Sequence, residues 1–263
     1  MRRPGAKSLL VLLPLVLFAL AHMDREQRST GGNWRSASRA PVGLAPDPAT
    51  TPEAVVQVYA ARAVRWRGYF GVHTWIAAKP SHAAEFAVYE VLSWGLRRRG
   101  TTVQISNRVP DSRWYGNAPE LLADLRGEGV DEVIGRIEAA VGGYPYTDEY
   151  HVWPGPNSNT FTAFVLRAAP EVRADLPANA IGKDYLGQRV LAKSPSGTGL
   201  QFNVLGVLGV LIGVEEGLEL NLLGLTFGLD PNQLSLKLPL AGRLGFGAVD
   251  VVRALEPALD EAP

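Results

Sequence analysis

The sequence has no cysteine among its 263 residues, and this absence removes several kinds of chemistry together. Without a thiol the chain forms no disulfide, holds no thiolate-bound metal and has no cysteine nucleophile. A lipoprotein signal, which needs a cysteine at its cleavage site, is excluded as well. Any covalent catalysis would therefore have to use a hydroxyl or another weaker nucleophile.

An excess of charge of one sign is also lacking, because 26 basic residues balance 26 acidic ones. Nucleic acid is therefore not an expected partner, since its binding proteins carry a basic face. The sequence has no HExxH motif, no metal-spaced histidine pair, and no Walker or Rossmann glycine pattern. We accordingly expect no metal and no cofactor. The Gly-x-Ser-x-Gly elbow of α/β-hydrolases is missing too.

An uncharged apolar run covers residues 9–21, directly after a basic flank of Arg2, Arg3 and Lys7. It ends in a small-x-small pattern typical of signal cleavage, and it is shorter than the about 20 residues that cross a hydrocarbon core. Residues 1–21 are thus predicted to be a signal peptide or a short anchor. The body would then lie in the cell envelope: periplasmic, exported, or anchored at the outer face of the inner membrane. An uncleaved segment would itself give membrane association.

Residues 22–51 are predicted to form an extended tether, because they are rich in arginine, serine, glycine and proline and have little apolar pattern. The hydrophobic content of the chain is 46%, enough for a substantial core. We therefore predict that residues 52–263 form a single α+β domain, a mainly antiparallel sheet with packed helices.

Local patterns give the order of elements within this domain. Thr51-Pro52 has the form of a helix start, and apolar residues at helical spacing continue to about Arg65. Alternation predicts strands, a basic turn separates the second from the third, and helical patterns follow. The predicted strands are 71–78, 85–94 and 101–108, the turn is 97–99, and the further helices are 118–126 and 130–141.

The C-terminal part, residues 200–246, repeats leucine and glycine in strand-like alternation. This pattern predicts a β-meander packed on the main sheet. Glu215, Glu216 and Glu219 argue against a membrane span, because charges are costly at mid-bilayer. A lipid-facing surface is the alternative interpretation of this segment.

The stretch WPGPNSNTF at residues 153–161 is the most distinctive of the chain. Its prolines and glycine force a turn, and the apolar residues that follow recur at helical spacing until Pro170. Asn157 or Ser158 is therefore the expected N-cap. Because a helix N-terminus has free N–H groups, Ser158 is either a cap or a nucleophile beside an oxyanion hole.

A serine nucleophile needs a base and a third group that orients the base. His73, on a predicted strand, is the candidate base, and Glu90 on the next strand is the candidate orienter. Tyr89 is the alternative, because the choice depends on a one-residue register. Asn157 and Asn159 would border the oxyanion hole. The expected cleft lining comprises Trp75, Trp114, Trp153 and His151.

Two motifs, VHTWIA at 72–77 and WPGPNSNTF at 153–161, resemble a bacterial family, domain of unknown function 3750, over most of the chain from about Trp34. More distantly, the order is similar to circularly permuted NlpC/P60 papain-like domains. That resemblance implies a papain-like fold in which His73, then Glu90 or Tyr89, then Ser158 occupy the catalytic positions. The nucleophile of that superfamily is cysteine, so a serine here would need full general-base catalysis.

Two functions follow from these patterns. The first is a hydrolase or acyltransferase of the envelope, with Ser158 as nucleophile and His73 as base. The second is a non-catalytic binding or assembly protein that uses the same cleft for an envelope peptide, glycan or lipid.

Overall fold

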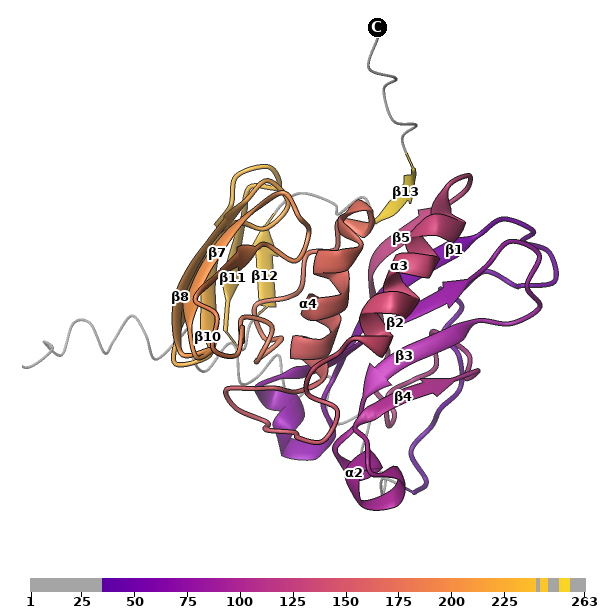
Figure 1. Cartoon of the computed structure of the whole chain (residues 1–263), viewed down its shortest axis with the longest axis horizontal. Helices are drawn as coiled ribbons and strands as arrows, with labels where there is room; N and C mark the ends of the chain where they lie inside the picture. Colours follow the sequence, from indigo (N-terminus) through magenta and orange to yellow (C-terminus); the bar gives the residue numbers. More distant parts are fainter. Residues whose placement is uncertain (1–34, 240–241, 246–250, 256–263) are drawn as a thin grey trace, which may run out of the picture.

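The structure is a computed structural model, and it describes residues 35–239, 242–245 and 251–255. It contains two mostly antiparallel sheets, with helix α4 (Ser158–Ala168) standing between them (Figure 1). The predicted α+β class with a C-terminal meander is confirmed. The predicted signal peptide or anchor, 1–21, and residues 22–34 of the predicted tether lie outside the described residues.

The first sheet has six strands in the order β13-β5-β1-β2-β3-β4. Strands β1 to β4 are antiparallel neighbours, and β13 is parallel to β5. The bounds are β1 (Val55–Arg62), β2 (Val72–Lys79), β3 (Ala87–Val91), β4 (Val103–Ser106), β5 (Glu120–Arg126) and β13 (Val252–Ala254).

Two predicted helices are strands in the structure. The segment predicted as a helix from 52 to 65 contains β1, and the segment from 118 to 126 contains β5. Strand β1 lies between β5 and β2 and is buried on both faces. A strand covered on both sides reads as a continuous apolar run rather than an alternation, and this run also matched helical spacing. The helix propensity of the leucines in β5 is overridden by its pairing with β1.

The predicted strand from 85 to 94 and basic turn at 97–99 also differ in detail. Strand β3 ends at Val91, and a short helix, α2 (Ser93–Arg99), follows. The three arginines occupy its last turn, where positive charge is favourable, and Gly100 ends it in the left-handed conformation.

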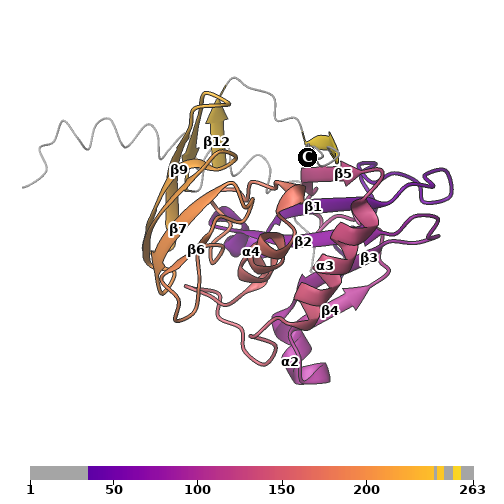
Figure 2. The ribbon, with the colours of Figure 1, turned by 45° about the horizontal axis from the view of Figure 1, so that its top comes forward.

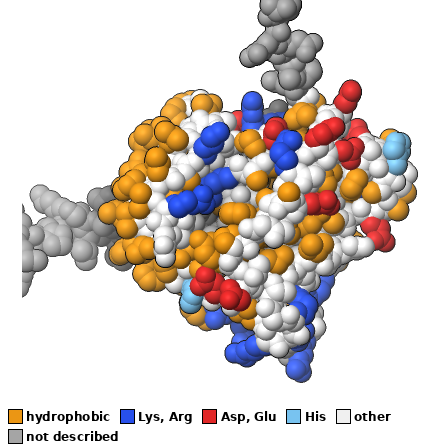
Figure 3. All heavy atoms as spheres, in the orientation of Figure 1, with side chains coloured by type: hydrophobic (Ala, Val, Ile, Leu, Met, Phe, Trp, Pro, Cys, Tyr) orange, Lys and Arg blue, Asp and Glu red, His pale blue; other side chains and the backbone are white. Residues whose placement is uncertain are grey.

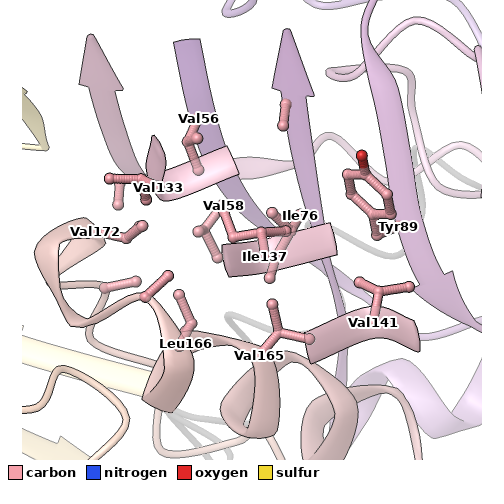
Figure 4. Packing of buried hydrophobic residues seen from close by; sticks show 14 of the residues in the cluster. Val56, Val58, Ile76, Tyr89, Val133, Ile137, Val141, Val165, Leu166 and Val172 are labelled. Carbon is pink, nitrogen blue, oxygen red and sulfur yellow. The ribbon is translucent and has the colours of Figure 1, made fainter. Parts of the chain in front are cut away.

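Helices α3 (Val130–Gly142) and α4 cover one face of the first sheet (Figure 2). Their apolar side chains meet those of the strands in the main core, where Val58, Ile76 and Tyr89 lie opposite Ile137 and Val165 (Figure 4). The opposite face carries a smaller, aromatic cluster that includes Tyr59, Trp75 and Trp114. The two faces of this sheet are therefore separate environments.

The second sheet is a seven-stranded meander in simple sequence order. It is held away from the first sheet by α4 and the irregular segment after it, which includes the short 3-10 helix η3 (Pro170–Val172), so it does not pack directly on the main sheet as expected (Figures 1 and 2). Its strands are β6 (Leu191–Lys193), β7 (Gly199–Val204), β8 (Leu208–Gly213), β9 (Gly217–Leu222), β10 (Leu225–Asp230), β11 (Ser235–Leu238) and β12 (Gly242–Gly245).

The described part of the predicted tether, residues 35–51, forms no helix or named strand. It is nevertheless fixed to the folded body. The backbone N–H groups of Val42 and Leu44 donate to Asp111, and Arg113 donates its N–H to Ala40. These residues belong to the folded domain rather than to a loose connection.

Candidate functional site

The N-terminus of α4 is capped by Asn157. The sequence predicts either Asn157 or Ser158 as this cap. The Asn157 Oδ1 accepts hydrogen bonds from the backbone N–H of Asn159 (2.9 Å) and Thr160 (3.2 Å). The Thr160 hydroxyl in turn accepts from the Asn157 N–H at 3.1 Å, which completes a capping box. Two of the helix's free N–H groups are therefore already satisfied within the motif.

The same motif ties α4 to its surroundings. The Asn159 amide donates to the carbonyl oxygens of Val72 (3.1 Å) and Ile181 (2.8 Å), and the Thr160 hydroxyl donates to that of Gly182 (2.7 Å). These side chains are all buried. Because buried polar groups are costly when unpaired, this set fixes strand β2, helix α4 and the 181–182 segment as one unit.

Ser158 is buried, with 3% of its surface exposed. The Tyr150 hydroxyl interacts with the hydroxyl and the backbone N–H of Ser158; burial raises the pKa of Tyr150, and these two interactions oppose the rise. The N–H of Asn159 is bound to Asn157. The backbone N–H groups of Ser158 and Asn159, which would hold the oxyanion beside a serine nucleophile, thus both have neighbours within the fold, and so has the serine hydroxyl.

His73 lies on the other face of the sheet. Its Nε2 is 2.9 Å from Glu90 Oε2 on β3, whereas the next side chain, Thr74, points to α4 and donates to Asn159 Oδ1 at 3.0 Å. Successive side chains of a strand point to opposite faces, so the α4 N-terminus and the His73 imidazole are separated by the sheet. The expected pairing of Ser158 with His73 is not formed.

The register of β2 and β3 decides between the two candidate orienters. Tyr89 is paired with Ile76, and its hydroxyl donates to Glu138 of α3 at 3.1 Å on the helix side. Glu90 is on the aromatic side with His73. Of the two candidates, Glu90 is therefore the one whose side chain faces His73, and Tyr89 faces the helices.

Aromatic rings enclose His73. Its imidazole stacks on Trp114 with centroids 4.0 Å apart and lies 5.7 Å from Trp75. The guanidinium of Arg108 is 4.6 Å from the Trp75 ring centroid and donates from Nε to Glu90 at 3.2 Å. The cluster is a closed stack of rings around one hydrogen-bonded carboxylate.

Burial lowers the pKa of His73 below its ordinary value, although the hydrogen bond to Glu90 opposes this. Burial alone would raise the pKa of Glu90, but the hydrogen bond from His73 and the Arg108 guanidinium leave that pKa below its ordinary value. A neutral imidazole that donates Nε2–H to an ionised Glu90 satisfies both groups.

The remaining expected cleft residues lie elsewhere. His151 is exposed, with its Nε2 3.5 Å from Glu149 Oε2. Trp153 is 52% exposed, and its indole N–H donates at 2.8 Å to the carbonyl oxygen of Leu223 in the meander. The structure thus gathers His73, Glu90, Trp75 and Trp114 on one face of the sheet and Asn157, Ser158 and Asn159 on the other.

The meander is amphipathic in the inverted sense: its apolar side chains point to solvent and its polar side chains point to the protein interior. Side chains that point away from the body are apolar and exposed, and they form a continuous surface, which we call the outer face (Figure 3). The outer face comprises Leu191, Leu200, Phe202, Val204, Leu208, Val210, Ile212, Leu218, Leu220, Leu222, Leu225, Phe227, Leu229, Leu236 and Leu244.

Side chains that point inward from the meander are mostly polar and buried. Asp184, from the segment after α4, accepts hydrogen bonds from Gln201 (2.6 Å), Asn221 (2.8 Å) and Thr226 (3.2 Å) on three different strands. Its pKa is lowered, because the partner Lys183 and these donors outweigh the opposing effect of burial. This inner network attaches the meander to the rest of the domain.

A second part of the inner network is ionic. Glu219 of β9 accepts from Lys183 at 2.5 Å and from Lys237 of β11 at 2.7 Å, and Lys237 also donates to Asp175 at 2.8 Å. Lys237 is 2% exposed, so its charge depends on these partners. The alternation of leucine with polar residues was visible in the sequence, and it contained this signal.

Other kinds of site find less support in the described residues. No group of three or more histidine, aspartate or glutamate side chains there could hold a metal ion. A cavity of about 520 Å³ opens between the end of β1, the start of β5 and the 175–179 segment, and Arg62, Arg113 and Asn179 are among its lining residues. None of the expected site residues lines it. Within the described ranges, no helix is long and apolar enough to cross a membrane.

These features define an α+β protein with two sheets. The first sheet has different environments on its two faces, and the 153–161 stretch anchors α4 on one of them. The second sheet is the meander, whose apolar side is exposed and whose polar side is buried. Residues 53–185, half of the chain, match the family described as protein of unknown function DUF3750, and the chain belongs to that family. The match covers the sheet strands β1 to β5, α3 and α4, and ends before the meander begins. No curated protein and no solved structure matches the chain in the comparisons made.

Proposed function

We propose that this protein is an exported cell-envelope protein that acts by binding rather than by catalysis, and that its binding surface is the outer face of the meander. The observation that carries the proposal is the inversion itself. Polar and ionic side chains occupy the buried side of the sheet, while leucine, valine, isoleucine and phenylalanine occupy the exposed side.

The size of the outer face supports a binding role. Seven strands at their usual spacing, each up to six residues long, span about 30 Å by 20 Å, or about 600 Å² before side-chain relief is counted. The largest apolar patch on a typical monomer is about 300–600 Å² and is often functional. The outer-face leucines are only about half exposed, so covering each would contribute about half of the value for full burial, or about 1 kcal/mol, and a partner that covers the whole face gains the sum.

The catalytic alternative has weaker support. Ser158 and the adjacent N–H groups have internal partners, and the histidine expected to activate the serine lies across the sheet. The resemblance to permuted NlpC/P60 domains stays a prediction. In this proposal it concerns only the origin of the fold and carries no catalytic activity. Export rests on the basic flank and apolar run of residues 1–21, which also remains a prediction.

The absence of cysteine makes a direct test practicable. We would introduce one thiol on the outer face, Leu220→Cys, and a control thiol on an exposed apolar position of the first sheet, Ile105→Cys; these side chains are 40% and 59% exposed. In isolated cell envelopes, a maleimide should label the Leu220→Cys variant at least about tenfold more slowly than the control, because a partner covers the face. Both should label rapidly after unfolding in urea.

Equal labelling of the two variants in the envelope would contradict the proposed binding surface. A fluorophosphonate probe supplies the test of catalysis. We expect no labelling of the wild-type protein, and labelling that disappears in Ser158→Ala would restore the hydrolase hypothesis.

A further inference from the structure

We infer that the outer face is covered by the acyl-chain region of a lipid bilayer surface. This inference rests on the proposed function, because it names the partner of the same face. Four observations favour lipid over a protein partner or a second copy of this chain: the chemistry of the face, the turns at its end, the placement of charge, and the N-terminal sequence.

Apart from Lys193 at its rim, the outward side of the meander strands offers a partner no hydrogen-bonding side chain. The side chains of the outer face are aliphatic or phenylalanine, without tyrosine, tryptophan, methionine or arginine. Protein interfaces are enriched in those four residue types and in phenylalanine, of which this face has two, and they form about one hydrogen bond per 100–200 Å². Acyl chains require neither, so the composition of the face fits a hydrocarbon phase better than a protein surface.

The turns at one end of the sheet extend this apolar surface. The turns between β7 and β8 and between β9 and β10 place Leu205 and Leu223 at φ 53° and 54°, each followed by a glycine that is also left-handed. Left-handed positions in hairpin turns favour asparagine or glycine, and a leucine there costs about 1–2 kcal/mol. Both leucines are more than half exposed.

Strained, exposed leucines at turn tips indicate that an apolar tip has a use. A flat partner, such as the same sheet of a second copy, would cover the face but leave the tips beyond its edge. Fluid acyl chains can surround both. Trp153 lies beside the second tip, with its indole bonded to Leu223, and tryptophan is favoured at the membrane interface.

Charge is distributed as an anionic membrane surface requires. Lys193, on edge strand β6, is the one charged side chain among the outward positions of the described strands, and it is exposed. A lysine at a rim can extend to lipid phosphate while its stem stays on apolar surface.

The acidic side chains of the meander are turned away from this surface. Glu216, Glu219 and Asp230 are buried on the inner side. Glu215 forms a two-point pair with Arg253 of β13 at 2.9 Å. The meander therefore presents no unpaired carboxylate from its described residues to anionic headgroups.

The N-terminal sequence also points to the hydrocarbon region of a membrane. The apolar run at 9–21 with its basic flank is predicted to enter a membrane during export, whether or not it is later removed. A second copy has no comparable observation in its favour.

The test uses the full chain and a fluorophore at one position. Bimane attached to the Leu220→Cys variant should shift to shorter wavelength on addition of vesicles of phosphatidylglycerol and phosphatidylethanolamine, and bromine on the acyl chains should quench it. Bimane on the Ile105→Cys variant should change little. Because the reporter sits on the outer face, binding by the N-terminal segment alone would leave it unchanged.

A paired substitution measures the contribution of the face. Leu220→Glu should weaken vesicle binding by about tenfold or more relative to Ile105→Glu, because a charge replaces a leucine in the acyl phase. Thermal unfolding of both variants checks that each is folded. If Leu220→Glu does not fold, the bimane measurement decides.

The outcomes separate the two proposals. Bimane on Leu220→Cys that ignores vesicles but shifts with protein concentration would overturn the lipid inference in favour of a second copy, and leave the binding surface intact. Bimane that ignores both, with slow labelling in the envelope, would indicate another protein and would also overturn the lipid inference. Rapid labelling in the envelope would overturn the binding surface itself.

Discussion

His73 and Thr74 are consecutive residues of β2, yet His73 bonds to Glu90 on one side of the sheet and Thr74 bonds to Asn159 of α4 on the other. The candidate base His73 therefore faces away from α4, and the sheet separates it from the candidate nucleophile Ser158. The consequence is that the family motif at 153–161 serves as an anchor for α4, and the histidine belongs to a separate aromatic cluster.

The anchoring role predicts unequal effects of two neighbouring substitutions. Asn157→Ala should lower the free energy of unfolding by about 2 kcal/mol or more, because it removes the cap and also the amide bonds to Val152 and Ile181. Ser158→Ala should lower it by about 1 kcal/mol, the usual value of one hydrogen bond. Urea unfolding of the two variants measures this, and a larger loss for Ser158→Ala would contradict the assignment of the cap.

The buried histidine predicts a pH dependence with a definite sign. Because the pKa of His73 is lowered in the folded state, the unfolded chain takes up a proton below its ordinary pKa of about 6.5 and the folded chain does not. The free energy of unfolding should therefore fall as the pH drops from 6.5 towards 5, by up to about 1.4 kcal/mol per pH unit. Urea unfolding at several pH values tests this.

The control for that series is His73→Gln, which keeps a donor for Glu90 but does not titrate. Its unfolding free energy should depend less on pH over the same window. The lowered pKa of Glu90 contributes stability that is present above about 4.5 and lost at lower pH, so it acts below the window of the histidine. Identical slopes in the two proteins would mean that His73 is protonated in the fold.

The ionic part of the inner network predicts a strong effect from one buried lysine. Lys237→Met should destabilise the fold by about 3–5 kcal/mol, since Asp175 loses a buried partner and Glu219 loses one of its two cations. Arg136→Met is the matched control, because Arg136 pairs with Glu171 at the surface and should cost under about 1 kcal/mol. Comparable losses in the two variants would contradict the network's role.

The strained turn tips predict a trade of stability against binding. Leu223→Asn should raise the free energy of unfolding by about 1 kcal/mol, because asparagine tolerates the left-handed conformation that leucine resists. The same substitution should weaken vesicle binding, since Leu223 is 71% exposed at the tip. Thermal unfolding and vesicle sedimentation on one sample test both halves. A destabilised variant would show that the tip leucine has a packing role.

The sequence allowed the fold class to be predicted, because the helical spacing of α3 follows its one buried side, and β2 was recognised as a strand although both of its faces are buried. It failed for β1 and β5, where apolar residues on both faces or helix-favouring leucines hide the two-residue period. Those strands are decided by their neighbours in the sheet, which a local pattern does not contain.

For the candidate site, the sequence allowed us to predict contacts between residues on the same face of the first sheet, but not which residues lie on opposite faces. The partnership of His73 with Glu90 follows from adjacent strands in register, and both residues were candidates from the sequence, with Tyr89 as the alternative to Glu90. The relation of Ser158 to His73 depended instead on which side of the sheet α4 would cover. That choice is made by the core side chains of β2, where Ile76 and Thr74 face the helix, and an error of one residue reverses it.

The inverted meander also sets how freely its own sequence can drift. Outward positions such as Val210 and Leu220 need only be hydrophobic. Leucine, isoleucine, valine and phenylalanine should therefore replace one another there during evolution. Inward positions such as Gln201 and Asn221 must each reach the same carboxylate of Asp184 with a donor of fixed length. In related chains the residues on the buried side of this sheet should therefore be conserved in identity. Those on the exposed side should be conserved only in their hydrophobic character.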